Sequence, residues 1–228
     1  MWLELTKPIT FQKSHSNVGL FYLKNFSYLC LMNKELLNVI VPYSKGELSK
    51  ETIIETHGEM FMSLLELYIN DSNSSTLREA ITCEIVGIES TGKKKGYDSK
   101  LTKEEIKPRN VQTGGKKTLD SWGNYSDLTH KRHNKYINDD VTIHISGFVD
   151  GFLMYVIKLK YVDLTQYFQN MLDRDLPNGD QKNKYVRTAY FTFTNIKDMP
   201  SLEVEFLRDN INEFKPFFQK DFFNYLTQ

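Results

Sequence analysis

Two spacings of apolar residues divide the chain into expected helices and strands. Helical spacing is clearest between Ser49, a favourable N-cap, and the polar turn of residues 70–75. The apolar face of this helix consists of Ile53, Ile54, Met60, Phe61, Leu64, Leu65 and Tyr68. Further helices are predicted over residues 124–137, 163–172 and 214–226.

Strand patterns occupy much of the remaining sequence. Residues 141–149 and 152–161 are two long apolar segments that meet at Asp150-Gly151, a pair typical of a tight hairpin turn. Residues 81–88 and 185–193 are also predicted to be strands, since β-branched and aromatic residues are frequent in both.

Two regions are defined less sharply. The short segments 93–98 and 103–107 are predicted to form a hairpin that ends at Pro108. Residues 18–40 are rich in Leu, Phe and Tyr, which fits a helix or a strand, and Pro42 is expected to end that element.

The order of these elements predicts an α/β fold with a mixed β-sheet flanked by helices. No Pro-, Gly- or Ser-rich linker divides the chain. We therefore expect residues 49–228 to form one compact unit, preceded by an N-terminal extension of residues 1–48.

The composition is that of an ordinary globular protein, with 40% hydrophobic and 25% charged residues among 228. Two cysteines, Cys30 and Cys83, are too few for a disulfide scaffold or a zinc site, which favours a reducing, cytoplasmic location. The first residues lack the pattern of a secretory signal. Because Lys24 and Lys158 interrupt the longest apolar stretches, we expect no membrane partner.

Charge is segregated along the chain, although 29 basic and 29 acidic residues cancel overall. Residues 91–135 carry 12 basic and 5 acidic side chains, whereas residues 1–90 and 136–228 are acidic. A basic segment of this density is typical of a surface that binds a polyanion, and equally of a solvated Lys-rich loop.

Three polar residues of the basic segment are expected to converge. Side chains alternate along a strand, so Glu105 and Lys107 point to the same face. Asp98, on the first arm of the predicted hairpin, is expected to lie within reach of Glu105. Two adjacent carboxylates suit Mg²⁺, and a neighbouring lysine can orient a water molecule and offset the charge of a phosphate.

The sequence Tyr97-Asp98, followed by Glu105-Ile106-Lys107, resembles the Asp…Glu-x-Lys signature of the PD-(D/E)XK nucleases, which include many type II restriction endonucleases. The order of the predicted elements is similar to that family's core of helix, three-stranded meander, helix and strand. The resemblance implies a restriction-endonuclease-like fold in residues 49–228 and a metal held by Asp98 and Glu105.

The resemblance also implies a glutamate on the first helix, for which Glu59 is the best candidate. Only six residues separate Asp98 from Glu105, and Gly96-Tyr97 replaces the customary proline. The first metal ligand is therefore either Asp98 or an acid on the predicted first strand, Glu84 or Glu89.

The function implied is a Mg²⁺-dependent endonuclease that hydrolyses phosphodiester bonds in double-stranded DNA, in particular a type II restriction enzyme. Cleavage of both strands of a palindromic site needs two active sites, so we expect a homodimer. The catalytic residues would be Asp98, Glu105, Lys107 and Glu59.

Residues around the motif suit DNA binding. Arg109, Asn110 and Gln112 carry side chains that can make bidentate contacts with base edges, and Lys116 and Lys117 follow them. Phosphate contacts are expected from Lys93, Lys94, Lys95, Lys131 and Arg132.

Two other classes of function remain open. The short spacing between Asp98 and Glu105 favours a non-catalytic nucleic-acid-binding accessory protein of a defence or phage system. The aromatic-rich C-terminal third and the neutral overall charge suggest a structural or assembly protein.

Overall fold

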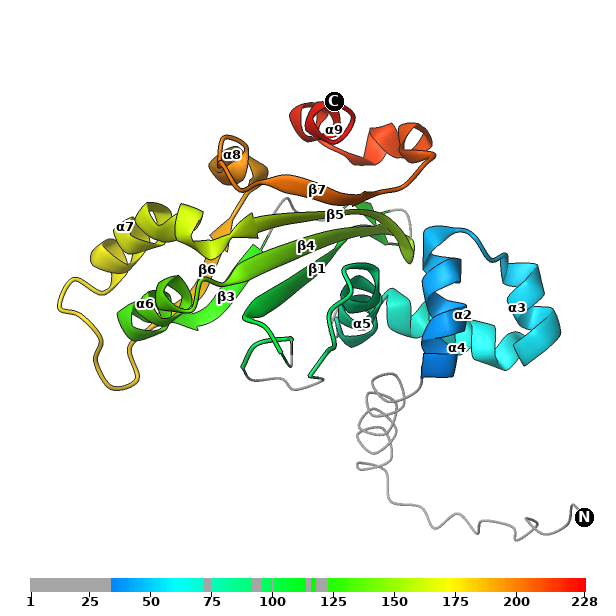
Figure 1. Ribbon diagram of the computed structural model, residues 1–228, viewed down its shortest axis with the longest axis horizontal. Helices are drawn as coiled ribbons and strands as arrows, with labels where there is room; N and C mark the ends of the chain where they lie inside the picture. Colours follow the sequence, from blue (N-terminus) through cyan, green and yellow to red (C-terminus); the bar gives the residue numbers. More distant parts are fainter. Residues whose placement is uncertain (1–33, 72–74, 92–95, 100, 114–115, 118–122) are drawn as a thin grey trace, which may run out of the picture.

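A mixed β-sheet forms the centre of the computed structural model, which describes residues 34–71, 75–91, 96–99, 101–113, 116–117 and 123–228 (Figure 1). The strand order is β2-β1-β4-β5-β7, and only β1 and β4 are parallel. The strands are β1 (Glu104–Thr113), β2 (Lys116–Lys117), β4 (Thr142–Val149), β5 (Phe152–Lys160) and β7 (Glu203–Leu207). A separate antiparallel ribbon pairs β3 (Gly123–Leu128) with β6 (Val186–Phe191).

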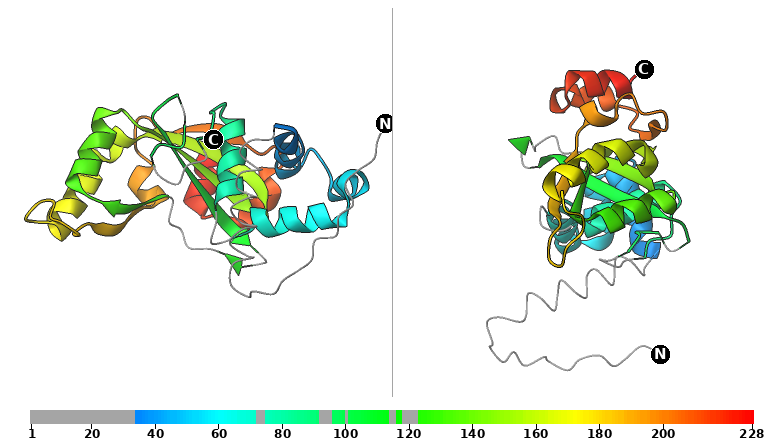
Figure 2. Two further views of the ribbon diagram at one scale, coloured as in Figure 1. Left: turned by 90° about the horizontal axis from the view of Figure 1, so that it is seen from below. Right: turned by 90° about the vertical axis from the view of Figure 1, so that its left-hand side faces the viewer.

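Helices gather at the two ends and along one edge of the sheet (Figures 1 and 2). One end holds α2 (Lys34–Lys45), α3 (Lys50–His57), α4 (Glu59–Ile69) and α5 (Thr76–Ile85). The remaining helical elements are α6 (His130–Asn138), η1 (Tyr161–Leu164), α7 (Thr165–Asp175), α8 (Phe193–Ile196), η2 (Ile211–Phe217) and α9 (Lys220–Leu226). This arrangement confirms the predicted mixed sheet flanked by helices. Within the described residues, no helix is both long enough and apolar enough to cross a bilayer.

The two faces of the sheet bury separate apolar clusters, because side chains alternate along β4 and β5. Phe148 and Val156 pack with Ile40, Ile53 and Ile81 of the first helices. The opposite face packs on the ribbon and the later helices through Ile143, Ile145, Ile157, Leu159, Tyr125, Phe168 and Phe222. A 2.6 Å hydrogen bond between the hydroxyl groups of Thr82 and Ser146, both fully buried, fastens α5 to β4.

The hairpin of β4 and β5 confirms the prediction made from Asp150-Gly151. Both turn residues have positive φ angles, 46° and 87°, as a tight turn between twisted strands requires. The helix near residues 163–172 and the strand near residues 185–193 are also confirmed, as α7 and β6.

The strand predicted over residues 81–88 is wrong, because residues 76–85 form helix α5. Leu77, Ala80 and Ile81 are buried at helical spacing, and packing on the sheet overrides the strand propensity of the β-branched residues. Two helix boundaries are also wrong. Gly58, with φ of 85°, divides the helix expected after Ser49 into α3 and α4, and Pro42 lies inside α2.

The predicted hairpin that ends at Pro108 is replaced by one long strand. β1 continues through Pro108 to Thr113 and pairs in parallel with β4, from Glu104 opposite Thr142 onward. Residues 93–95 of the predicted first arm lie outside the described residues. The helix expected over residues 124–137 begins later, at His130, where the Thr129 side chain accepts a hydrogen bond from the Arg132 amide. The residues before it form β3.

Gly147 offers a test of the packing between β4 and β5. A Cβ atom at Gly147 would lie 2.1 Å from the ring of Tyr155, its cross-strand partner, which is 1% exposed. We expect Gly147→Ala to lower the free energy of unfolding by about 2–3 kcal/mol, measured by urea denaturation. In a Tyr155→Leu background the loss should be smaller, and an equal loss in both backgrounds would contradict this packing.

Candidate functional site

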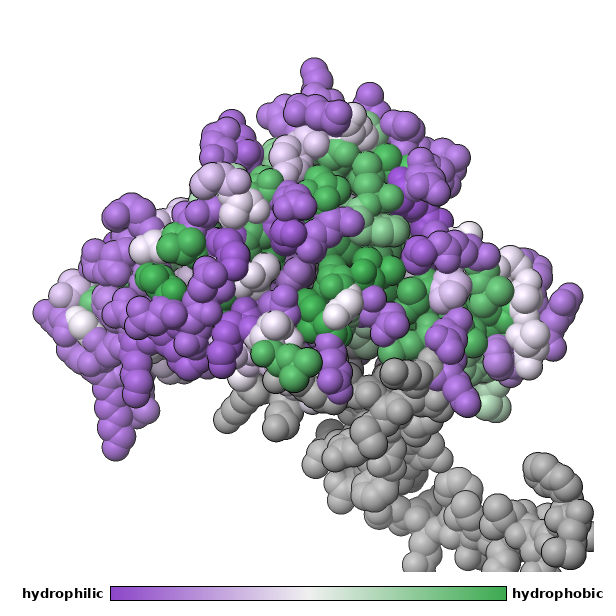
Figure 3. Space-filling view, viewed as in Figure 1, coloured by the Kyte–Doolittle hydropathy of each residue, from purple (hydrophilic) through white to green (hydrophobic). Residues whose placement is uncertain are grey.

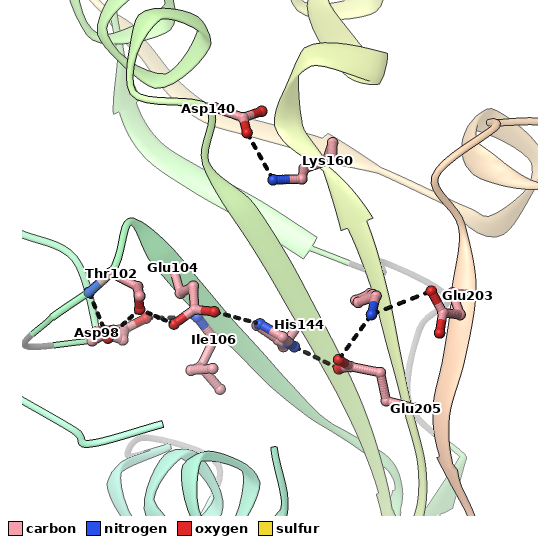
Figure 4. Close-up of polar contacts among 11 residues, drawn as sticks. Asp98, Thr102, Glu104, Ile106, Asp140, His144, Lys160, Glu203 and Glu205 are labelled. Atoms are coloured by element: carbon pink, nitrogen blue, oxygen red, sulfur yellow. Dashed lines mark hydrogen bonds and ion pairs between the residues drawn. The ribbon is translucent and has the colours of Figure 1, made fainter. Parts of the chain in front are cut away.

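Asp98 lies beside the first residues of β1 (Figure 4). Its Oδ2 accepts a 2.7 Å hydrogen bond from the Ile106 amide, and its own amide donates to the Glu104 carbonyl oxygen at 2.9 Å. The Ile106 N–H therefore points away from β4 to the other edge of β1. Because N–H directions alternate along a strand, the nitrogen of Pro108 faces the same edge. Proline has no N–H group, and on this edge its absence removes no hydrogen bond to β4.

Glu105 and Lys107 form a pair on one face of β1, as their alternate positions predict. Lys107 Nζ donates to Glu105 Oε2 at 2.6 Å, and the side chains of Glu105 and Lys107 are 5% and 18% exposed. The ammonium group also lies 4.8 Å from the centre of the Tyr125 ring. The pair is thus held in a low-dielectric setting, where an uncompensated charge would be costly.

Tyr136 fixes the other oxygen of the Glu105 carboxylate. Its hydroxyl donates to Glu105 Oε1 at 3.1 Å and accepts two hydrogen bonds from Arg132, from Nε at 2.9 Å and Nη2 at 2.6 Å. With both acceptor positions filled by a guanidinium group, the phenol proton is left to point at Glu105. Burial, and then the neighbouring Glu105 charge, raise the pKa of Tyr136.

Burial raises the pKa of Asp98 to about 6, although the hydrogen bond from the Ile106 amide lowers it. The charges of Glu105 and Glu79 raise it further, and Lys107 opposes them. Asp98, Glu105 and Lys107 therefore form one electrostatically coupled group, and the structure brings together these three residues of the sequence prediction.

A cavity of about 260 Å³ opens along the edge of β1 that is opposite β4. Four consecutive residues of β1, Ile106 to Arg109, line one side of it, and residues of α5 and β3 line the others. Those other residues are Ser75, Glu79, Gly123 and Asn124. The cavity gives a small polar group access to Lys107.

Glu79, not Glu59, is the helix glutamate that lines the cavity and acts on the pKa of Asp98. Glu79 lies on α5, which packs against β1, and it accepts a hydrogen bond from the Ser75 hydroxyl. Glu59 is exposed at the start of α4, and neither it nor Glu84 or Glu89 is among the groups that shift the pKa of Asp98. The sequence pattern gives no sign of Glu79, because the strand that it predicts over residues 81–88 overlaps helix α5.

The residues expected to bind DNA are dispersed. Arg109 lines the cavity, and Asn110 follows it on β1. Arg132 turns inward, since its Nη1 donates to the Ser126 carbonyl oxygen at 2.6 Å and its other nitrogens to Tyr136, whereas Lys131 is exposed. Lys93, Lys94 and Lys95 are outside the described residues, and Gln112, Lys116 and Lys117 belong to the paired ends of β1 and β2.

A second polar cluster lies on the opposite face of β1 (Figure 4). His144, 3% exposed, has its Nδ1 2.6 Å from Glu205 Oε2 and its Nε2 3.5 Å from Glu104 Oε1. Lys158 lies 3.2 Å from Glu203 and 3.5 Å from Glu205. This cluster joins β1, β4, β5 and β7 through the His144–Glu205 hydrogen bond and the ion pairs of Lys158, as in a structural network.

Among the residues that the structure describes, no group of three or more His, Cys, Asp or Glu side chains is arranged to hold a metal ion. Neither a known protein family nor a curated protein sequence matches this chain. The candidate site is therefore defined by its own geometry.

The raised pKa of Asp98 predicts a pH-dependent effect on stability. As the pH rises from about 4 to about 6, the unfolded chain releases this proton before the folded chain does, so stability is lost over that interval and stays lost above it. Asp98→Asn keeps an oxygen that accepts from Ile106 but carries no charge. We expect it to raise the free energy of unfolding above pH 6 by up to about 3 kcal/mol, with the gain fading toward pH 4 in urea denaturation.

Asp139→Asn is the control of opposite sign. Hydrogen bonds from Lys135 and then Tyr97 lower the pKa of Asp139, a partly exposed group, so its charge stabilises the fold above its pKa. Its removal should lower stability at neutral pH. An Asp98→Asn variant that behaves like Asp139→Asn would contradict the buried, coupled environment of Asp98.

Proposed function

We propose that this protein is a Mg²⁺-dependent endonuclease acting on double-stranded DNA, with the restriction-endonuclease-like architecture that its Asp…Glu-x-Lys motif resembles. One observation carries the proposal. Asp98, Glu105 and Lys107 form a coupled group at the edge of β1 that is opposite β4, beside a cavity that reaches Lys107.

The residues fit a magnesium ion by the chemistry of their donors. Mg²⁺ takes one or two protein carboxylates and fills its remaining positions with waters and phosphate oxygens. Asp98 and Glu105 would hold it, with Glu79 close by, and their mutual repulsion is the reason a dication is favoured among them. Such an ion would polarise the phosphate and acidify a bound water.

The protein side chains have separate tasks in this proposal. Tyr136 and Lys107 each hold one oxygen of Glu105, so the carboxylate keeps one orientation. Lys107 faces the cavity and offsets the negative charge that accumulates on the phosphate during hydrolysis. At pH 7 to 8, above its pKa of about 6, Asp98 is ionised and available as a ligand.

Cleavage of both DNA strands at a palindromic site would require two such sites related by a twofold axis. A homodimeric type II restriction enzyme is the form of the proposal that meets this requirement.

The test is cleavage of plasmid and phage DNA with Mg²⁺. Glu105→Gln and Lys107→Met should each lower the cleavage rate by at least about 100-fold, because one removes a ligand charge and the other the charge facing the phosphate. Binding of the same DNA in Ca²⁺, measured by fluorescence anisotropy, should persist.

The helix glutamates supply a matched pair of variants. Glu79→Gln should lower the rate by about tenfold or more, since this side chain borders the cavity, whereas Glu59→Gln on exposed α4 should leave it unchanged. Full activity in Glu105→Gln would overturn the mechanism. If the wild-type chain binds DNA but shows no Mg²⁺-dependent nicking, the alternative function, a non-catalytic accessory protein, is favoured instead.

Tyr136 is proposed as a positioning residue for Glu105. Tyr136→Phe removes the hydrogen bond to Oε1, so the Mg²⁺ concentration for half-maximal cleavage should rise by about tenfold or more. Tyr161→Phe is the control, because Tyr161 is fully buried nearby but its hydroxyl contacts His133 at 2.9 Å. An equal shift in both variants would show that only the packing of the tyrosines matters.

A further inference from the structure

The ribbon of β3 and β6 has one buried face and one polar face. The face that packs in the core carries Tyr125, Ala189 and Phe191, and this alternation ends at Asp127, whose φ is 54°, beyond which Leu128 and Val186 are also buried. The alternate positions are exposed and lie opposite each other in two cross-strand pairs, Asn124 with Tyr190 and Ser126 with Thr188. The outer face therefore presents an amide, two hydroxyl groups and an aromatic ring that is 52% exposed.

This outer face begins at the candidate site. Asn124 lines the cavity together with Lys107 and Arg109. Tyr190 is its cross-strand neighbour, and paired residues of this kind have Cβ atoms roughly 5 Å apart. The polar face thus continues from the cavity along the ribbon, away from β1.

Positive charge accompanies the polar face. Lys182 and Lys184 precede β6, Arg187 lies on it, and all three are exposed. None of the three forms an ion pair within the part of the chain that the structure describes. The strands β3 and β6 themselves carry one cation, Arg187, and one carboxylate, Asp127, so the positive excess comes from Lys182 and Lys184, with Asp180 before them. In Figure 3, hydrophilic residues cover the end of the molecule where α6 and α7 lie.

We propose that the β3–β6 ribbon is the surface that binds duplex DNA. This inference rests on the proposed endonuclease function, and it specifies where the substrate is held. The major groove of B-DNA admits a two-stranded ribbon, and amide and hydroxyl side chains can pair with base edges there. Lys182 and Lys184, which precede β6, contact flanking phosphates. A duplex held in this way passes the cavity at Asn124, where Lys107 meets the backbone.

The experiment is equilibrium binding of a fluorescein-labelled DNA duplex to the full-length chain in Ca²⁺, without cleavage. Lys182→Ala/Lys184→Ala should weaken binding by on the order of tenfold per lysine at about 0.1 M salt, and lower the salt slope by about one per lysine. Tyr190→Ala should weaken binding by a few-fold. Lys197→Ala/Lys220→Ala removes two exposed lysines elsewhere and should match the wild type.

The outcomes separate this inference from the proposed function. If the wild type binds DNA and the ribbon variants bind it as tightly as the control variant, the ribbon surface is overturned. The proposed nuclease function is then unaffected. If the ribbon variants bind DNA more weakly but the wild type does not cleave DNA in Mg²⁺, the DNA-binding surface is supported and the nuclease function is rejected. A preference for an RNA duplex would overturn the surface, because the major groove of RNA is too narrow for a ribbon.

Discussion

Parallel pairing of β1 with β4 is the constraint from which the candidate site follows. β4 occupies one edge of β1, and β2 pairs with the other edge only at Gln112 and Thr113. Between Glu104 and Asn110 no described strand pairs with the second edge, and α5 and β3 lie beside it. An edge of this kind exposes backbone N–H groups, and proteins rarely leave them unused. Here Asp98 accepts from the Ile106 amide, and Pro108 removes the next donor along the edge.

A chain of hydrogen bonds that begins at a permanently charged guanidinium group lowers the free-energy cost of burying the Glu105 carboxylate near this edge. Arg132 donates to the Tyr136 hydroxyl, Tyr136 donates to Glu105, and Lys107 neutralises the same carboxylate. A guanidinium group stays protonated at any physiological pH, so the direction of these hydrogen bonds is fixed. The sequence alone suggested a phosphate contact for Arg132, whereas in the structure its guanidinium group donates to Tyr136 and so supports Glu105.

Local pattern predicted those parts of the structure that local forces determine. The turn at Asp150-Gly151 and the shared face of Glu105 and Lys107 depend on backbone geometry over a few residues, and both were predicted. Helix α5 was missed because residues 81–88, which overlap its second half, are rich in β-branched side chains, and only packing of Leu77 and Ile81 against the sheet favours the helix. Parallel pairing joins residues nearly 40 positions apart, such as Glu105 and Ile143, which no local pattern encodes.

The same division explains which residues of the candidate site the sequence can suggest. Asp98, Glu105 and Lys107 lie within ten residues of each other, so a motif can show them, but Glu79 and Tyr136 reach the site from two helices that only the fold brings near. The supporting residues and Asp98 have opposite effects on stability. The Arg132–Tyr136 support stabilises a charge, whereas Asp98 is a carboxylate whose raised pKa records a cost of ionisation in the folded chain. The Mg²⁺ ion of the proposed function would reverse this cost, because a dication beside Asp98 and Glu105 favours their ionised forms.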